Sequence, residues 1–328
     1  MTESTFSMDR AYLQRLVGRM LIGTTLITDW SPAETGWVND IISSGLRTFL
    51  QGGTQRHKWS FLHPLTSLTT SESYSAGTVA QASGVVTLTG GTWPSWAAEG
   101  ELTVGGNTFT VASRDSDTQL TLDDTSATND VAAGTSYQLG RPAYDLPDDV
   151  AYVTGPFTYR PGSATLYGPI EQISVEAVRA HRQWTDVISR PQAYTVMPKA
   201  NSPTTGSPRW QVRFWPTPDG AYPLEYRYRV RLDDITDVNK YPMGSEEHSE
   251  TIKAAVLAEA ELESAGSEGP HHAKFLRCLE ASIGIDNETA AEFLGYNHDR
   301  SERVDVDARL QARAPGSYVT YEGHNLTY

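Results

Sequence analysis

The strongest hydrophobic pattern in the chain lies between residues 31 and 51. Its apolar positions follow helical spacing and comprise Val38, Ile41, Ile42, Gly45, Leu46, Phe49 and Leu50. Ser31 precedes Pro32 and stands three residues before Glu34, the arrangement of a capping box with proline at the first helical position. The pair Gly52-Gly53 is typical of a helix end. We therefore expect a helix with a wide apolar face that another element must cover.

Helical periodicity returns in four other segments. They run from Asp9 to Leu21, from Ser174 to Trp184, from Ser245 to Ala265 and from Pro270 to Ile283. The short connection that follows Leu21 predicts an antiparallel pair of helices at the start of the chain. The segment that begins near Ser245 carries small residues such as Ala255 and Ala258, which favour close packing of helices.

Between residues 72 and 140 the pattern changes to short alternating runs separated by turn residues. The five runs contain Val86/Leu88, Leu102/Val104, Phe109/Val111, Leu120/Leu122 and Tyr137/Leu139. Gly105-Gly106 predicts a tight hairpin. The segment holds eight acidic residues against one basic residue, Arg114, so its net charge of −7 is half of the −14 of the chain. These features predict a small β-barrel or sandwich inserted into a host fold.

Shorter β patterns flank this segment. The stretch from His57 to Pro64 is predicted to enter a strand with Trp59 and Phe61 on one face. Further strands are expected at residues 150–153 and 164–167.

A later pair of alternating runs predicts a β-hairpin. Residues 210–214 and 224–230 alternate aromatic and apolar with polar side chains, and Pro216 and Pro218 lie in the connection. This pattern predicts an antiparallel sheet with one buried face.

The patterns together predict an α+β fold. An α-helical hub joins an antiparallel β-sheet and carries an inserted small all-β barrel or sandwich domain. The chain of 328 residues is long enough for about two or three domains. The expected parts are the N-terminal helices with the first strand, the inserted domain, the β region of the host, the C-terminal helices and a terminal arm, at residues 1–71, 72–140, 141–235, 236–300 and 301–328.

Charge and composition restrict the function. No cluster of Lys and Arg offsets the net charge of −14, so binding to nucleic acid through its phosphates is not expected as the main activity. An acidic surface repels DNA, which suits a DNA conduit as well as an ordinary enzyme. No apolar run approaches the roughly 18 residues of a membrane span, and residues 1–10 lack a signal-peptide pattern. We therefore expect folding in the cytoplasm and no membrane partner. The single cysteine, Cys278, is expected to be a small core residue.

The sequence holds no catalytic motif. It has neither a phosphate-binding glycine loop nor a Gly-x-Ser-x-Gly elbow. His271 and His272 have no further ligand at metal spacing and are expected to be structural or surface residues. Asp148 and Asp149 are expected to order a turn, and a hydrolase that uses either of them is a minor alternative. No catalytic residue, cofactor or metal ion is predicted.

Two groups of aromatic residues could bind a partner. Trp93 and Trp96 could stack on a sugar, although Pro94 favours a loop folded over the core of its own domain. The tyrosines near the C-terminus, Tyr318, Tyr321 and Tyr328, belong either to a docking arm or to a frayed end.

The order of several motifs resembles the head–tail adaptor (connector) proteins of tailed bacteriophages. The pattern Ile41-Ile42-x-x-Gly45-Leu46-Arg47-x-Phe49 is followed by His57–Pro64, Tyr144–Asp149, the segment 214–228 and a terminal helix pair. The resemblance covers residues 8–295, and the segment 72–140 resembles an addition present in some members.

The resemblance implies a structural virion protein of the neck, without enzymatic activity. Such proteins form a ring, usually of about twelve copies, between the portal protein and the tail or a second adaptor (tail terminator), and double-stranded DNA passes through it. The C-terminal arm is then expected to dock on the portal or on a neighbouring copy, with Arg309, Arg313, Tyr318, Tyr321 and Tyr328 as its contact residues.

A second function remains open. The chain could be a tail or baseplate component whose inserted β domain binds a host-surface glycan through Trp93 and Trp96.

Overall fold

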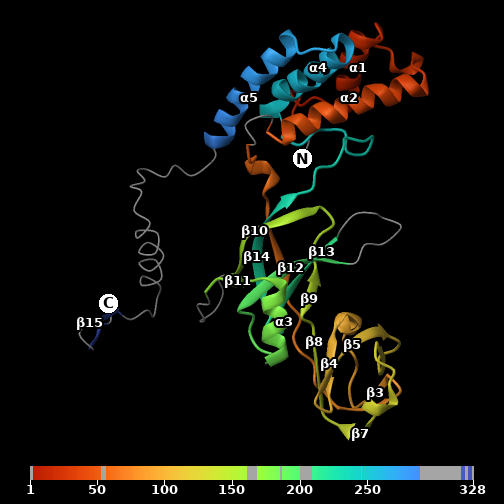
Figure 1. Ribbon diagram of the computed structural model, residues 1–328, viewed down its shortest axis with the longest axis vertical. Helices are drawn as coiled ribbons and strands as arrows, with labels where there is room; N and C mark the ends of the chain where they lie inside the picture. Colours follow the sequence, from red (N-terminus) through yellow and green to blue (C-terminus); the bar gives the residue numbers. More distant parts are fainter. Residues whose placement is uncertain are drawn as a thin grey trace. The chain divides into compact units, whose positions relative to one another are not determined.

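The computed structural model describes residues 3–52, 57–160, 168–184, 187–199, 209–244, 246–288, 319–321 and 324–326. The chain divides into two compact units, Met1–Ile283 and Gly284–Tyr328. The first unit mixes helices with several antiparallel sheets, in agreement with the predicted class, and contains three hydrophobic clusters (Figure 1).

The first cluster is helical. It is formed by α1 (Arg10–Leu21), α2 (Pro32–Leu50), α4 (Ser249–Ala265) and the apolar residues Phe275 and Leu279 of α5 (Pro270–Glu288). The predicted capping box is present at α2, because the Ser31 amide donates to Glu34 Oε2 at 2.7 Å and the Glu34 amide donates to Ser31 Oγ at 3.3 Å. Helices α1 and α2 agree with the predicted limits to within one residue, whereas α4 begins at Ser249 instead of Ser245 and α5 continues beyond Ile283 to Glu288.

Helices α2 and α4 approach each other closely at one glycine. A Cβ atom added to Gly45 would lie 2.6 Å from the Cα atom of Val256, which is nearer than non-bonded carbon atoms can come. Val256 and Ile42, one turn along α2, have no more than 2% of their surface exposed. Gly45 thus lets the two helix backbones approach and close the centre of this cluster.

Two sheets share the second cluster, which is rich in aromatic residues. The three-stranded sheet has the order β1 (Leu65–Thr69), β14 (Pro223–Val230), β10 (Val150–Tyr159), and the four-stranded sheet has the order β11 (Glu171–Gln172), β12 (Ala193–Lys199), β13 (Arg209–Trp215), β9 (Ala143–Asp145). All pairs are antiparallel except β11–β12. Phe157 lies at the centre of the cluster, with its ring 4.5 Å from that of Tyr226 and 4.7 Å from that of Tyr194. Helix α3 (Val175–Trp184) contacts β12 and buries Val178.

The third cluster lies inside a curled seven-stranded sheet, a half-barrel. Its strands are β2 (Thr78–Ala82), β3 (Val85–Thr89), β4 (Glu101–Val104), β5 (Asn107–Arg114), β6 (Gln119–Leu122), β7 (Val131–Thr135) and β8 (Tyr137–Gly140), in the order β7-β2-β3-β6-β5-β4-β8. The five predicted strands are present as β3, β4, β5, β6 and β8, and Gly105 and Gly106 form the hairpin turn at positive φ. Strands β2 and β7 were not predicted. The inward positions of β2 are Val79 and the polar Gln81, and β7 exposes Ala132, Ala133 and Gly134, so neither strand has an apolar alternation.

Two β predictions are wrong. The stretch from His57 to Pro64 contains a 3-10 turn, Ser60–Leu62, in place of a strand, because the Trp59 indole N–H donates to the Phe49 carbonyl at 3.0 Å and holds the chain against the end of α2. The turn still brings the rings of Trp59 and Phe61 into a stack at 5.5 Å.

The predicted hairpin of residues 210–230 is the second error. Strand β13 has β12 and β9 on its two edges, and β14 has β1 and β10, so neither strand has a free edge for the other. The strand expected at residues 164–167 lies outside the described residues.

Because of the close approach at Gly45, replacing Gly45 or Gly36 of α2 with alanine should have opposite effects on stability. Gly45→Ala should lower the free energy of unfolding by at least about 1 kcal/mol, because the added methyl group collides with the α4 backbone. Gly36→Ala should raise it by up to about 1 kcal/mol, because nothing lies within 4 Å and alanine favours the helix. Urea unfolding of both variants measures the difference, and equal effects would contradict the close packing.

The capping box predicts a pH-dependent contribution to stability. Ser31→Ala should cost about 1 kcal/mol, whereas Ser44→Ala on the exposed face of the same helix should cost nothing. The hydrogen bond from the Ser31 amide lowers the pKa of Glu34, so the Glu34 contribution is present at neutral pH and is lost as the pH falls through that lowered pKa. Thermal unfolding of Glu34→Gln and the unaltered chain should therefore converge in acid.

Candidate functional site

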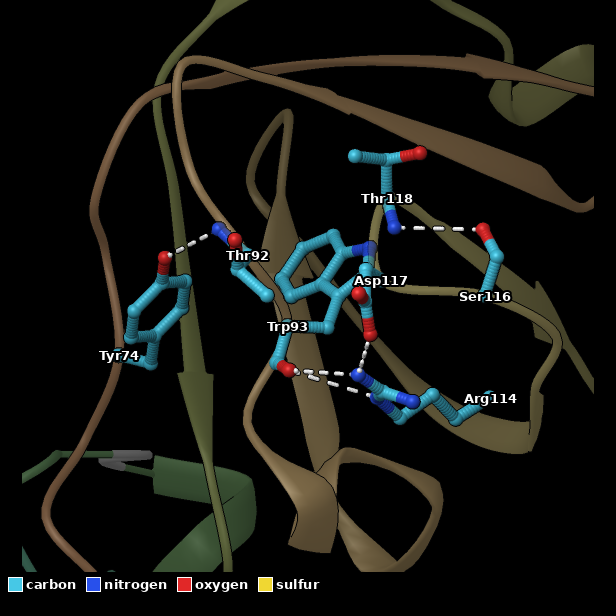
Figure 2. A network of polar contacts seen from close by, with 7 residues as sticks. All are labelled: Tyr74, Thr92, Trp93, Arg114, Ser116, Asp117 and Thr118. Atoms are coloured by element: carbon cyan, nitrogen blue, oxygen red, sulfur yellow. Dashed lines mark hydrogen bonds and ion pairs between the residues drawn. The ribbon is translucent and has the colours of Figure 1, made fainter.

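The loop around Trp93 is a structural part of the half-barrel. The Arg114 guanidinium donates to the Trp93 carbonyl at 3.0 Å and pairs with Asp117 at 2.5 Å, and the Thr92 amide donates to Tyr74 Oη at 2.9 Å (Figure 2). The Trp93 ring lies inside this network with 1% of its surface exposed, and it packs edge-on against Tyr137 at 5.2 Å. Trp93 is therefore a core residue and offers no face to a sugar, as the preferred interpretation of the sequence predicted.

A compact group of charges joins the half-barrel to the aromatic cluster. Glu101 on β4 accepts hydrogen bonds from Arg182 of α3 and Arg213 of β13, and its side chain is only 16% exposed. Glu99 pairs in the same region with Arg141, whose guanidinium lies 4.5 Å from the ring of Tyr144. Desolvation by burial lowers the pKa of Arg141. The acidic residues of β4 and the preceding turn thus hold the half-barrel to its neighbours.

A groove crosses the helical cluster between α2, α4 and α5. Its volume is about 310 Å³, and its lining includes Glu259, Leu262, Glu268, His272, Phe275 and Leu276. Leu262 and Leu276 are 44% and 41% exposed, so two large apolar side chains are open to solvent in the same groove.

The end of the groove is organised by a buried carboxylate. Glu261 of α4 is 9% exposed and accepts hydrogen bonds from the amides of His271 and His272, at 2.9 and 3.4 Å. It therefore neutralises the positive N-terminal end of α5 from a second helix.

The residues considered for chemistry have structural partners. His272 lies 3.4 Å from Glu268, and Asp149 accepts a hydrogen bond from Tyr228 Oη at 2.8 Å. Asp148 pairs with Arg209 at 3.3 Å. Cys278 is half-buried against the helical cluster. The described residues contain no group of His, Cys, Asp and Glu that could hold a metal ion. Within the same residues, no helix has the length and apolarity needed to cross a membrane.

The predicted arm residues lie almost entirely outside the described residues. Arg309, Arg313, Tyr318 and Tyr328 are not described. Tyr321 ends the short strand β15 (Val319–Tyr321), which pairs antiparallel with β16 (His324–Leu326). The structure thus places one of the five predicted contact residues in a hairpin and leaves their role as a prediction.

Sequence reasoning missed the residues that join the elements. Glu101, Arg182 and Arg213 come from three segments far apart in the chain, and Glu261 acts on a different helix from its own. The available signal was the presence of arginines in α3 and β13 beside buried apolar positions, since a charge there needs a partner.

Comparison with protein families identifies residues 88–293 as a match to the SU10 adaptor protein family. The chain belongs to the SU10 adaptor protein family. The match extends from β3 in the half-barrel to just beyond α5, so it includes the Glu101 junction and the groove residues Glu259 and Glu268. The predicted resemblance to phage adaptor proteins is confirmed, and the chain is a structural phage protein. A comparison with curated proteins gives no match.

The two ion pairs of Glu101 predict that Glu101 contributes more to stability than the nearby Glu99. Glu101→Gln should lower the free energy of unfolding by about 2 kcal/mol, because it removes the partly buried negative charge with which both Arg182 and Arg213 pair. Glu99→Gln should cost less than about 1 kcal/mol, because Glu99 is 54% exposed and has one partner. Denaturant midpoints of the two variants test this order, and equal losses would contradict the bridging role of Glu101.

Proposed function

We propose that this SU10-family adaptor forms a ring that joins the portal protein to the tail, or to a second adaptor (tail terminator), in the neck of the virion. The observation that carries the proposal is the family match over residues 88–293. The groove on the helical cluster supports it, because exposed apolar side chains beside polar ones are typical of protein contacts.

The ring would form part of the DNA conduit. The net charge of −14 supports a wall that repels the phosphate backbone, so that double-stranded DNA passes without binding. We therefore place acidic groups on the lumen of the ring. A basic lumen in an assembled ring would contradict this part of the proposal.

We infer that the half-barrel is a domain inserted into a host fold of helices and sheets. The two ends of its segment lie side by side, because the Tyr74 amide donates to the Leu139 carbonyl and the Leu139 amide donates to the Tyr74 carbonyl, both at 2.8 Å. A segment with adjacent ends can be added to a host loop without displacing the host. The host parts are then residues 1–71, 141–235 and 236–300, with an arm at 301–328.

Imaging of stained particles tests the adaptor role directly. The full chain is imaged alone and after mixing with the portal protein of the same phage. Closed rings stacked on the portal support the proposal and give the copy number. A chain that stays monomeric and does not bind the portal contradicts it.

If the arm docks on the portal, its deletion should affect attachment to capsids without affecting the stability of the fold. Deletion of residues 301–328 should abolish attachment to portal-bearing capsids and leave the melting temperature unchanged, because the described residues of the three hydrophobic clusters all lie at or before Ile283. Alanine at Tyr318, Tyr321 and Tyr328 should weaken attachment, whereas alanine at Tyr241, which is 44% exposed outside the arm, should not. Co-sedimentation with capsids measures attachment. Full binding by the truncated chain would exclude a docking role for the arm.

A further inference from the structure

Helix α1 presents a basic stripe on its outer face. Leu13 and Val17 are fully buried in the helical cluster, so Tyr12, Arg15 and Arg19 lie on the opposite side of the helix at positions i, i+3 and i+7. Both arginines are exposed, and neither forms an ion pair with a described carboxylate. Tyr12 is 36% exposed and adds an aromatic ring to this face.

The groove between α2, α4 and α5 has the complementary character. Glu259 and Glu268 provide its carboxylates, Leu262 and Leu276 its apolar surface, and no Lys or Arg occurs among its described lining residues. Glu263, next to Leu262, adds a further exposed carboxylate at the same end of α4. The groove therefore fits a helix that carries cations beside apolar groups.

The stripe and the groove belong to different faces of one helical cluster. Helix α1 contacts α2 and α4, whereas α5 is joined to α4 through the hydrogen bonds of Thr251 with Ser282 and the Cys278 carbonyl. In Figure 1 α4 separates α1 from the first turns of α5. Two complementary surfaces on different faces cannot satisfy each other within one copy. In an assembly, the stripe of one copy can contact the groove of the next copy in a head-to-tail arrangement. Such contacts form a closed ring when the rotation that relates neighbouring copies is a whole fraction of a turn.

We propose that the basic stripe of α1, made of Tyr12, Arg15 and Arg19, docks into the α2–α4–α5 groove of a second copy of this chain. The inference rests on the proposed ring and names its subunit contact. The arginines meet Glu259 and Glu268, while the Tyr12 ring covers Leu262 and Leu276. The contact is heterologous, so each copy uses its stripe toward one neighbour and its groove toward the other.

Charge reversal on each surface tests the contact in the full chain. Arg15→Glu/Arg19→Glu and, separately, Glu259→Arg/Glu268→Arg should each weaken ring formation at least about tenfold, since like charges then face each other across the contact. The control matched to the stripe variant is Lys58→Glu/Arg179→Glu, which lowers the net charge by the same amount at two exposed cations elsewhere and should leave rings intact. Ring formation is counted in stained images with the portal present.

Mixing the two reversed chains gives the sharper result. The basic groove of one variant then faces the acidic stripe of the other, while the unaltered surfaces pair as before, so alternating rings should reappear although neither variant assembles alone. Thr48 donates to Glu259 at 2.9 Å, so each variant is first melted to confirm folding, and Glu268→Arg alone replaces the groove variant if it unfolds.

The outcomes separate this inference from the proposed function. Rings from the unaltered chain and from both reversed variants overturn the contact and leave the adaptor role standing. Failure of the mixture to reassemble, or loss of rings from the groove variant alone, also overturns it, because the groove then binds something other than α1. Absence of rings from the unaltered chain with the portal overturns both.

Discussion

The close approach of α2 and α4 at Gly45 is the constraint on which the helical part depends. With no side chain at Gly45, the backbone of Val256 comes within the space a Cβ atom would fill, and the apolar faces of both helices close over one core. Helix α5 is then held against α4 by Thr251, Ser282 and Glu261. The groove and the outer face of α1 are consequences of this packing, because both are what remains exposed after the cluster is closed.

Electrostatics has two separate roles in the molecule. Some acidic residues are structural, as Glu101 shows by holding two arginines from α3 and β13 at a partly buried junction. The remaining acidic surface is free to act at long range, and the proposed conduit uses it to keep DNA from binding. The net charge of the chain does not show which acidic residues are structural and which act at long range. That distinction depends on which carboxylates have a cationic partner nearby in the folded structure.

The sequence predicted the helices and most of the half-barrel because their signals are local. Ser31, Pro32 and Glu34 form a capping box with one another, and Gly105-Gly106 makes a turn whatever surrounds it. The candidate site was less accessible. The groove requires residues of α2, α4 and α5 together, and the predicted arm residue Tyr321 lies in a described hairpin whose docking is a proposal.

The sequence alone determined the start of α2 at its capping box, the apolar face of that helix and the tight turn at Gly105-Gly106. Only the tertiary structure decided that β13 and β14 lie in different sheets, that residues 60–62 turn against α2, and that Glu101 joins three elements. The physical reason is range. Caps, turns and periodicity depend on neighbours within a few residues, whereas strand partners and ion pairs are chosen among residues that meet only after the chain has folded.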